Sequence, residues 1–251
     1  MTAREPLRIA VPVPVAVIGA RGRLGSFACS LLRESSAFAL VAAYGREDPW
    51  PSALAGSGAL VALEATRAGQ GFAHGLAILE CRVRPVIATS GIEPRESDEL
   101  DRRARELGLG GLVVPNFSLA AVLLQRTCAE LARHFDFAEI LELHHERKRD
   151  APSGTALETA RRIVEARGSA SLAGSDPEPA RGDSRAGVPI HSVRMPGLYA
   201  HQEVLFGAPG ETLSVRHDMQ GPSAFGPGIL RALRYAETAC GVGSGLELAL
   251  G

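Results

Sequence analysis

The chain has 251 residues and a mass of 26.4 kDa, and 45% of its residues are hydrophobic, enough to bury the core of one large domain or of two small ones. Its 27 basic and 28 acidic residues give a formal net charge of −1, which argues against nucleic acid or a membrane surface as a partner. The four cysteines lie far apart without a CxxC pair, which favours reduced thiols in the cytoplasm over disulfides or a metal site. No window has the roughly 18 apolar residues that a membrane span needs.

Short apolar runs alternate with helical patterns in the first half of the chain. This alternation is typical of a parallel sheet wrapped by helices, so we predict a doubly wound α/β domain. Two prolines interrupt the first apolar run, and we interpret the first residues as a ragged leader before a strand. The predicted strands cover residues 13–20, 38–44, 84–90 and 111–116, and the predicted helices cover residues 24–34, 73–80 and 96–108.

The pattern changes after Pro115. The three last predicted strands follow one another with short turns, which indicates a mixed or antiparallel sheet in a second, α+β domain. Residues 168–189 are rich in Gly, Pro, Ser and Asp, and we expect a mobile loop there. The predicted helices cover residues 118–134, 153–167 and 225–240, and the predicted strands cover residues 137–145, 190–194, 201–207 and 211–217.

A glycine-rich segment, "VAVIGARGRLGS", places Gly19, Gly22 and Gly25 between a predicted strand and a predicted helix. Glycines at these positions allow a tight turn and a close approach to a pyrophosphate, which the first N–H groups of the helix would bind. A lone glycine triplet also fits an ordinary strand-to-helix turn, but the surrounding β–α–β pattern favours a dinucleotide site. Arg21 and Arg23 either add positive charge there or are solvated.

The end of the second predicted strand bears on the type of dinucleotide. NAD sites usually carry an acidic side chain there, which binds the ribose 2′-hydroxyl, whereas arginine accommodates a 2′-phosphate. This chain has Gly45 and Arg46 at the expected place, with Glu47 and Asp48 already in the loop. The segment therefore favours NADP(H), and the alternative is an arginine that only faces solvent.

The segment "ELHHERKRDAPSGTAL", residues 142–157, gathers polar groups after an apolar strand. Ser153 or Thr155 can cap the following helix, whose free N–H groups can hold an anion. His144, His145 and Lys148 offer proton donors near neutral pH. A histidine at a strand end is often structural and a loop lysine is usually solvated, but together these residues indicate a site for a small carboxylate-bearing substrate.

Five segments in order resemble dihydrodipicolinate reductases, the 4-hydroxy-tetrahydrodipicolinate reductases of diaminopimelate and lysine biosynthesis. The polar segment just quoted resembles the family's signature, and residues 181–218 resemble the form found in actinobacterial-type members. The three other matching segments are "VIGARGRLG", "VIATSGI" (86–92) and "VPNFSLAAVLL" (114–124).

The resemblance implies a fold, a reaction and an assembly. We expect a Rossmann-type domain over residues 1–116, completed by a C-terminal helix in residues 222–251, and a mixed-sheet substrate and oligomerisation domain over residues 117–221 of a homotetramer. The implied reaction is reduction of 4-hydroxy-tetrahydrodipicolinate, a cyclic imine dicarboxylate, to tetrahydrodipicolinate with NADPH or NADH.

The resemblance also assigns roles to individual residues. His144 matches the family's proposed general acid, and Lys148 matches its catalytic lysine. The residues that match substrate-binding groups are His145, Ser153, Gly154 and Thr155. Those that match cofactor-binding groups are Gly19, Arg21, Gly22, Arg23, Leu24, Gly25, Arg46, Ala88, Thr89 and Ser90.

Three departures from the family pattern leave alternatives open. The chain has "ATSG" (88–91) where the family commonly has GTTG, "LEAT" (63–66) where it has IDFT, and Gly221-Pro222 in place of the usual Asp-Arg pair. A paralogous reductase of a related cyclic imine would share the fold and cofactor chemistry. A nucleotide-binding regulator without catalysis is the second alternative, but the intact polar segment argues against it.

Overall fold

The computed structural model describes residues 11–168, 182–184 and 187–251. The chain divides into two compact units, which we call unit 1 (Met1–Phe117 and Phe225–Gly251) and unit 2 (Ser118–Ala224). The expected leader, apart from its last residues, and most of the expected loop at 168–189 lie outside the described residues.

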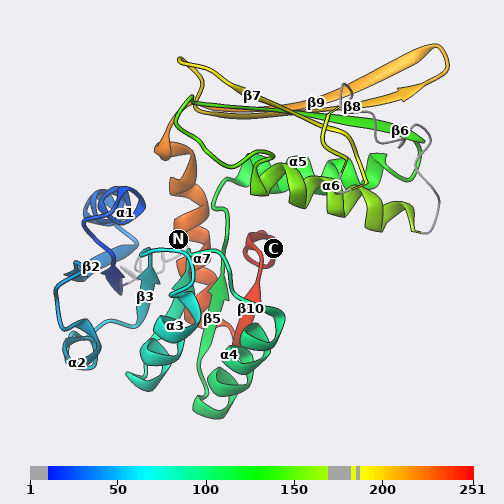
Figure 1. Cartoon of the computed structure of the whole chain (residues 1–251). Coiled ribbons are helices and arrows are strands. Elements are labelled where there is room, and N and C mark those ends of the chain that lie inside the picture. The colour runs from blue at the N-terminus through cyan, green and yellow to red at the C-terminus, as the bar shows by residue number, and fades with distance from the viewer. Residues whose placement is uncertain (1–10, 169–181, 185–186) are drawn as a thin grey trace, which may run out of the picture. The chain divides into compact units, whose positions relative to one another are not determined.

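Unit 1 contains a six-stranded sheet in which every paired strand runs parallel to its neighbour (Figure 1). The strand order is β10-β5-β4-β3-β1-β2, so the chain moves from β1 to one side for β2 and to the other side for β3. The strands are β1 (Val13–Ile18), β2 (Phe38–Tyr44), β3 (Val61–Glu64), β4 (Arg84–Ile87), β5 (Gly110–Val113) and β10 (Gly241–Ser244).

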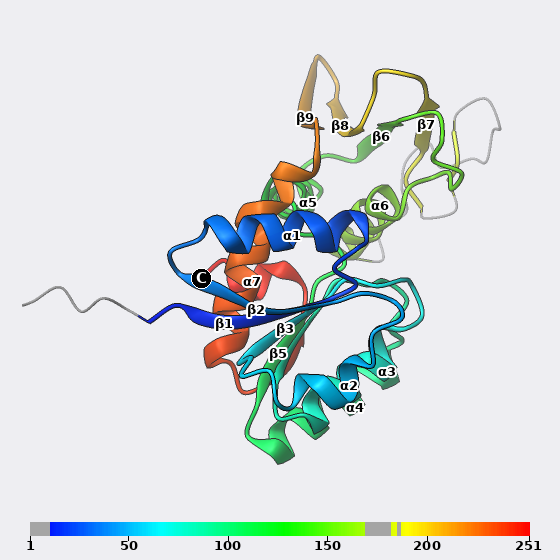
Figure 2. The same cartoon turned by 90° about the vertical axis from the view of Figure 1, so that its left-hand side faces the viewer.

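Helices cover both faces of this sheet, as Figure 2 shows. On one face lie α1 (Arg23–Glu34) and α7 (Gly226–Thr238), and on the other lie α2 (Trp50–Leu54), α3 (Gly71–Glu80) and α4 (Pro94–Leu107). Local signals set the ends of α4: Glu93 and Glu96 form a capping box, and Gly108 adopts a left-handed conformation with φ +66° after the last turn. The predicted Rossmann-type doubly wound domain is confirmed.

Two strands of unit 1 were not predicted from the sequence. All four residues of β3 are buried between neighbouring strands and covering helices, so no alternation of polar and apolar residues marks it. The C-terminal segment contributes more than the expected helix, because β10 follows α7 and pairs in parallel with β5. The strand predicted over residues 84–90 ends at Ile87, so Ala88, Thr89 and Ser90 follow the strand.

Unit 2 contains a four-stranded mixed sheet in the order β7-β6-β8-β9. Strand β6 pairs in parallel with β7 and antiparallel with β8, and β8 pairs antiparallel with β9, which confirms the predicted mixed sheet. The elements are α5 (Leu119–Leu131), β6 (Phe137–His144), α6 (Gly154–Arg167), β7 (Ile190–Arg194), β8 (Ala200–Ala208) and β9 (Glu211–Met219).

The core of unit 2 lies between one face of this sheet and helices α5 and α6 (Figure 1). Ile140, Val204 and Phe206 alternate with outward residues along β6 and β8, and they pack with Ile163 of α6. Glu142 and Gln202 continue the same inward row toward the end of β6, and both are buried. The inward face of the sheet therefore changes from apolar to polar where the "ELHH" segment begins. None of the helices in the described part of the chain is long and apolar enough to cross a membrane.

Candidate active site

The glycine loop of unit 1 lies where the strand order reverses direction, between β1 and β3. In open parallel sheets, ligands bind outside the carboxyl ends of the strands at such a point. Gly19 follows β1 with φ +86°, and a Cβ atom on it would lie 2.4 Å from the carbonyl oxygen of Ala65, which follows β3. A Cβ atom on Gly25 would lie 2.1 Å from the carbonyl oxygen of Gly19. The close approach of strand, turn and helix therefore requires glycine at both positions.

Helix α1 begins directly after this turn. Its N-cap is Gly22, which has no side chain to accept a hydrogen bond from the first turn of the helix. The first N–H groups of a helix have no partner within the helix, and together with the helix dipole they attract an anion. The turn and the helix start therefore fit the pyrophosphate of a dinucleotide.

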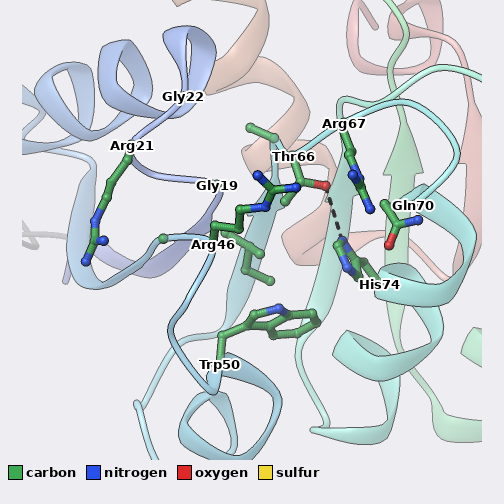
Figure 3. A pocket seen from close by; sticks show the side chains of 12 residues that line it. Gly19, Arg21, Gly22, Arg46, Trp50, Thr66, Arg67, Gln70 and His74 are labelled. Atoms are coloured by element: carbon green, nitrogen blue, oxygen red, sulfur yellow. Dashed lines mark hydrogen bonds between the residues drawn. The ribbon is translucent and has the colours of Figure 1, made fainter.

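A pocket of about 610 Å³ opens beside this turn, a size suited to a small-molecule ligand. In Figure 3 the side chain of Arg46 extends across the pocket toward Thr66, whereas Arg21 points to the other side of the glycine loop. The ring of Trp50 meets His74 edge to face, with ring centroids 5.2 Å apart. The pocket is lined by Ile18, Gly19, Arg21, Gly22, Gly45, Arg46, Trp50, Ala65, Thr66, Arg67, Gln70 and His74.

A buried carboxylate supports the wall of this pocket. Glu64, the last residue of β3, is fully buried and accepts hydrogen bonds from the backbone N–H and hydroxyl of Thr66, from Nδ1 of His74 at 3.1 Å and from the hydroxyl of Thr89 at 2.8 Å. Burial raises the pKa of Glu64, but the hydrogen bonds from His74, Thr66 and Thr89 outweigh it, and the net pKa lies below the ordinary value. Glu64 is therefore ionised near neutral pH and holds Thr66 and His74 in the pocket wall.

As expected from the sequence, Asp48 lies in the loop that follows β2. The Asp48 carboxylate turns back and accepts a hydrogen bond from the N–H of Gly45 at 2.5 Å, and it lies 3.6 Å from the guanidinium of Arg21. Asp48 therefore contacts two residues that line the pocket, Gly45 and Arg21, without lining the pocket itself.

Unit 2 gathers its polar groups around Glu142, which is fully buried near the end of β6. Arg194 of β7 donates to both carboxylate oxygens, from Nη1 at 2.9 Å and from Nη2 at 2.7 Å. His144 Nδ1 lies 2.5 Å from Glu142 Oε2, and the N–H of Ser153 donates to Oε1 at 3.2 Å. The buried carboxylate thus connects β6, β7 and the start of α6.

The start of α6 is the second part of this cluster. Ser153 is its N-cap, and the serine oxygen accepts a hydrogen bond from the N–H of Ala156 at 3.2 Å. Gly154 and Thr155 occupy the first two helical positions, whose N–H groups have no acceptor within the helix. Gly154 is exposed, and a Cβ atom there would meet nothing within 4 Å, so a ligand can approach this helix start closely.

Lys148 lies in the loop that leads to α6. Its side chain is 22% exposed, and Nζ donates to Asp150 at 2.6 Å. The Lys148 ammonium holds the pKa of Asp150 below its ordinary value. Next to His144, His145 has a buried Nδ1 atom without a hydrogen-bond partner among the described residues. A substrate anion would find a cation, a helix start and two imidazoles on one segment of chain.

Both halves of the chain match models of one family. The model described as "Dihydrodipicolinate reductase, N-terminus" covers residues 13–117, and the model described as "Dihydrodipicolinate reductase, C-terminus" covers residues 120–245. The chain belongs to the dihydrodipicolinate reductase family.

Relatives that align with nearly the whole chain support the same family. The 4-hydroxy-tetrahydrodipicolinate reductase of Streptomyces coelicolor is 44% identical over 243 residues, which cover 93% of this chain and 96% of the relative. That of Coxiella burnetii (strain Dugway 5J108-111) is 38% identical over 226 residues, or 88% and 92% of the two chains. A solved dipicolinate-bound dihydrodipicolinate reductase from Paenisporosarcina sp. TG-14 has a TM-score of 0.84 and 33% identity, covering 94% of this chain and 98% of that chain.

Membership of the dihydrodipicolinate reductase family makes the chain an oxidoreductase that reduces 4-hydroxy-tetrahydrodipicolinate with NADH or NADPH. The comparisons favour neither of the two alternatives, the paralogous reductase and the regulator without catalysis.

The structure brings some of the expected cofactor residues together and separates others from the pocket. Gly19, Arg21, Gly22 and Arg46 line it. The remaining expected residues do not line it: Arg23, Leu24, Gly25, Ala88, Thr89 and Ser90. Of these, Gly25 shapes the turn by its missing side chain, and Thr89 directs its hydroxyl at Glu64.

Sequence reasoning missed several residues of the pocket and of the cluster. Trp50, Arg67, Gln70 and His74 line the pocket without having been singled out. Thr66 could have been found, because it stands in the "LEAT" segment that was compared with the family pattern. Glu142 stood in the quoted segment without a role, and no sequence signal connects it to Arg194.

Proposed function

We propose that unit 1 binds the nicotinamide dinucleotide at the glycine loop and that the Glu142 cluster of unit 2 binds and protonates the substrate. The observation that carries this proposal is the cluster itself. His144 and the start of α6 are hydrogen-bonded to the buried Glu142 carboxylate, and the Lys148 backbone is hydrogen-bonded to Arg194, the partner of Glu142. The enzyme then serves diaminopimelate and lysine biosynthesis in the cytoplasm, where its four free cysteines stay reduced.

The division of labour follows from the charges. A bound nicotinamide supplies the hydride, and the chain's own residues bind the substrate and move a proton. The substrate is a dicarboxylate, so the Lys148 ammonium and the N–H groups of Gly154 and Thr155 attract its carboxylates. His144, at the end of β6, donates the proton that completes the reduction.

The reaction is tested with the product of dihydrodipicolinate synthase as substrate. Consumption of NADPH that depends on this product, and formation of tetrahydrodipicolinate, would support the proposal. Turnover of a different cyclic imine at a higher kcat/KM would identify the chain as the paralogous reductase instead.

NADPH should be used at least as well as NADH. The Arg46 guanidinium crosses the pocket and can meet a 2′-phosphate, which a planar guanidinium binds with two hydrogen bonds. Replacing Arg46 by alanine should therefore raise the KM for NADPH about tenfold or more and change the KM for NADH much less. The measurement is kcat/KM with each cofactor for the wild type and the variant.

Asp48, which contacts the pocket residues Gly45 and Arg21, provides the matched comparison. Its carboxylate repels a 2′-phosphate and can accept a hydrogen bond from a 2′-hydroxyl, so Asp48→Asn should weaken NADH and not NADPH. A wild-type preference for NADH of tenfold or more, removed by Asp48→Asn, would overturn the assignment to Arg46.

We propose a homotetramer assembled through the sheet of unit 2. Strand β9 is nine residues long and lies at the edge of this sheet, and such edges are usually covered by another chain or element. On the outer face, Phe137 and Leu205 are 49% and 38% exposed. A second copy would bury these apolar side chains.

Light scattering at micromolar concentration should give the mass of four chains. Leu205→Glu places a charge on the outer face and should reduce this mass. Leu123 lies on α5 and is 51% exposed, and Leu123→Glu should leave the mass unchanged. A wild-type protein that remains monomeric at this concentration would contradict the assembly.

A further inference from the structure

A buried ion pair underlies the groups to which we assign substrate binding. Glu142 and Arg194 come from neighbouring parallel strands, in a register that pairs Glu142 with Ser192 and His144 with Arg194. The Glu142 side chain has no exposed surface, and that of Arg194 is 18% exposed. Both carboxylate oxygens accept from the guanidinium, which is the strong bidentate geometry.

The remaining hydrogen bonds of this pair reach three different segments. Arg194 Nε donates to the carbonyl oxygen of Lys148 at 3.2 Å, and Nη2 donates to that of Asp150 at 2.7 Å. Glu142 accepts from the N–H of Ser153 and contacts His144. One ion pair therefore fixes the end of β6, the Lys148 loop and the start of α6.

The charge state of Glu142 decides the tautomer of His144. Burial raises the pKa of Glu142, but hydrogen bonds from His144, Arg194 and Ser192 outweigh it and lower this pKa to about 2. An ionised carboxylate only accepts hydrogen bonds, so the His144 Nδ1 atom must carry the proton between them. The proton that His144 donates must therefore come from Nε2 of an imidazolium, whose Nδ1–H stays bound to the carboxylate. After the transfer the neutral imidazole keeps its proton on Nδ1.

We propose that Glu142 is a positioning residue of the reductase, which with Arg194 fixes the tautomer of His144 and holds Lys148 and the start of α6 in place before the substrate binds. This inference rests on the proposed roles of His144 and Lys148. It assigns to the pair an effect on the reaction that a buried ion pair with a purely structural role would not have.

Glu142→Gln is the first test, because the amide keeps the shape and removes the charge. Arg194 retains the amide oxygen, so the amide NH₂ faces His144 Nδ1 and favours the proton on Nε2. The ¹⁵N spectrum of histidine-labelled protein, with the His144 signal assigned by its loss in His144→Ala, should show this exchange of tautomers. We expect kcat to fall roughly 10- to 100-fold, because the amide NH₂ does not stabilise the imidazolium that donates the proton. Removal of a residue that orients a metal-binding histidine has an effect of this size.

Two other measurements distinguish this loss of kcat from a general loss of structure. NADPH affinity, measured by the fluorescence of Trp50, the single tryptophan, should stay within about twofold, because the glycine loop belongs to unit 1 and Glu142 to unit 2. Glu158→Gln is the matched control: Glu158 accepts from Arg161 and Arg162 on α6, away from the cluster, and its loss should leave kcat within about twofold.

A second variant covers the case in which the unpaired Arg194 prevents folding. Glu142→Gln with Arg194→Met removes both charges, and it should fold and still show the loss of kcat. An unchanged His144 tautomer with kcat within about twofold of the wild type, in either folded variant, would overturn the inference. Failure of both variants to fold would also overturn it, since the pair would then be required for the fold alone.

A different result would contradict the proposed function. If His144→Ala and Lys148→Ala keep the wild-type kcat, the substrate site itself is misassigned. If both lose activity while Glu142→Gln does not, only the positioning role of Glu142 is wrong.

Discussion

Lys148→Ala and His144→Ala should each lower kcat by roughly 10²- to 10⁴-fold, the range expected when assisted proton transfer or charge stabilisation is lost. Lys148 supplies a cation in the loop that leads to α6, and His144 supplies the imidazole held by Glu142. Both residues belong to unit 2, whereas the glycine loop belongs to unit 1. The affinity for NADPH, measured by the fluorescence of Trp50, should therefore hardly change.

A neighbouring cation gives the control for the lysine variant. Arg147 precedes Lys148 in the same loop, its side chain is 86% exposed, and it pairs only loosely with Glu146 at 3.6 Å. Arg147→Ala should keep kcat within about twofold, because exposed ion pairs contribute little. If Arg147→Ala and Lys148→Ala lowered kcat equally, the effect would come from the net charge of the loop and not from Lys148 at the substrate.

Gly19→Ala should destabilise unit 1 by about 3 kcal/mol and weaken NADPH binding at least about tenfold. The added Cβ atom would lie 2.4 Å from the backbone oxygen of Ala65, and the residue would have to keep φ +86°. Backbone atoms cannot move aside as a flexible side chain does, so the turn between β1 and α1 would shift away from β3. Thermal unfolding followed by circular dichroism and a titration with NADPH measure the two effects.

Gly58→Ala separates the cost of the backbone angle from the cost of the close contact. Gly58 also has a positive φ, +74°, but a Cβ atom there would meet nothing within 4 Å. The Gly58→Ala variant should lose only about 1 kcal/mol of folding stability and bind NADPH normally. An equal loss in Gly19→Ala and Gly58→Ala would show that the contact with Ala65 does not determine the geometry of the loop.

Local patterns in the sequence predicted most elements and pointed to the two segments to which we assign the site. Ser153 was expected as a possible helix cap because a serine oxygen reaches an N–H three residues later, and the structure shows this bond to Ala156. Gly19 and Gly25 were singled out because a tight strand-to-helix turn excludes side chains, and the distances around both confirm that physical reason. Such features depend on contacts between residues close together in the chain, so the sequence shows them directly.

The tertiary structure alone decided which distant residues complete each site. Strand β3 is short and buried on all sides, so it has no periodicity that a sequence could reveal, yet it places Glu64 and the pocket wall beside the glycine loop. The partner of Glu142 is Arg194, 52 residues later, and their contact depends on the register in which β6 and β7 pair. Many arginines could have paired with that carboxylate. Only the packing of the strands, which buries Glu142 and sets the donors around it, selects the combination that holds the cluster together.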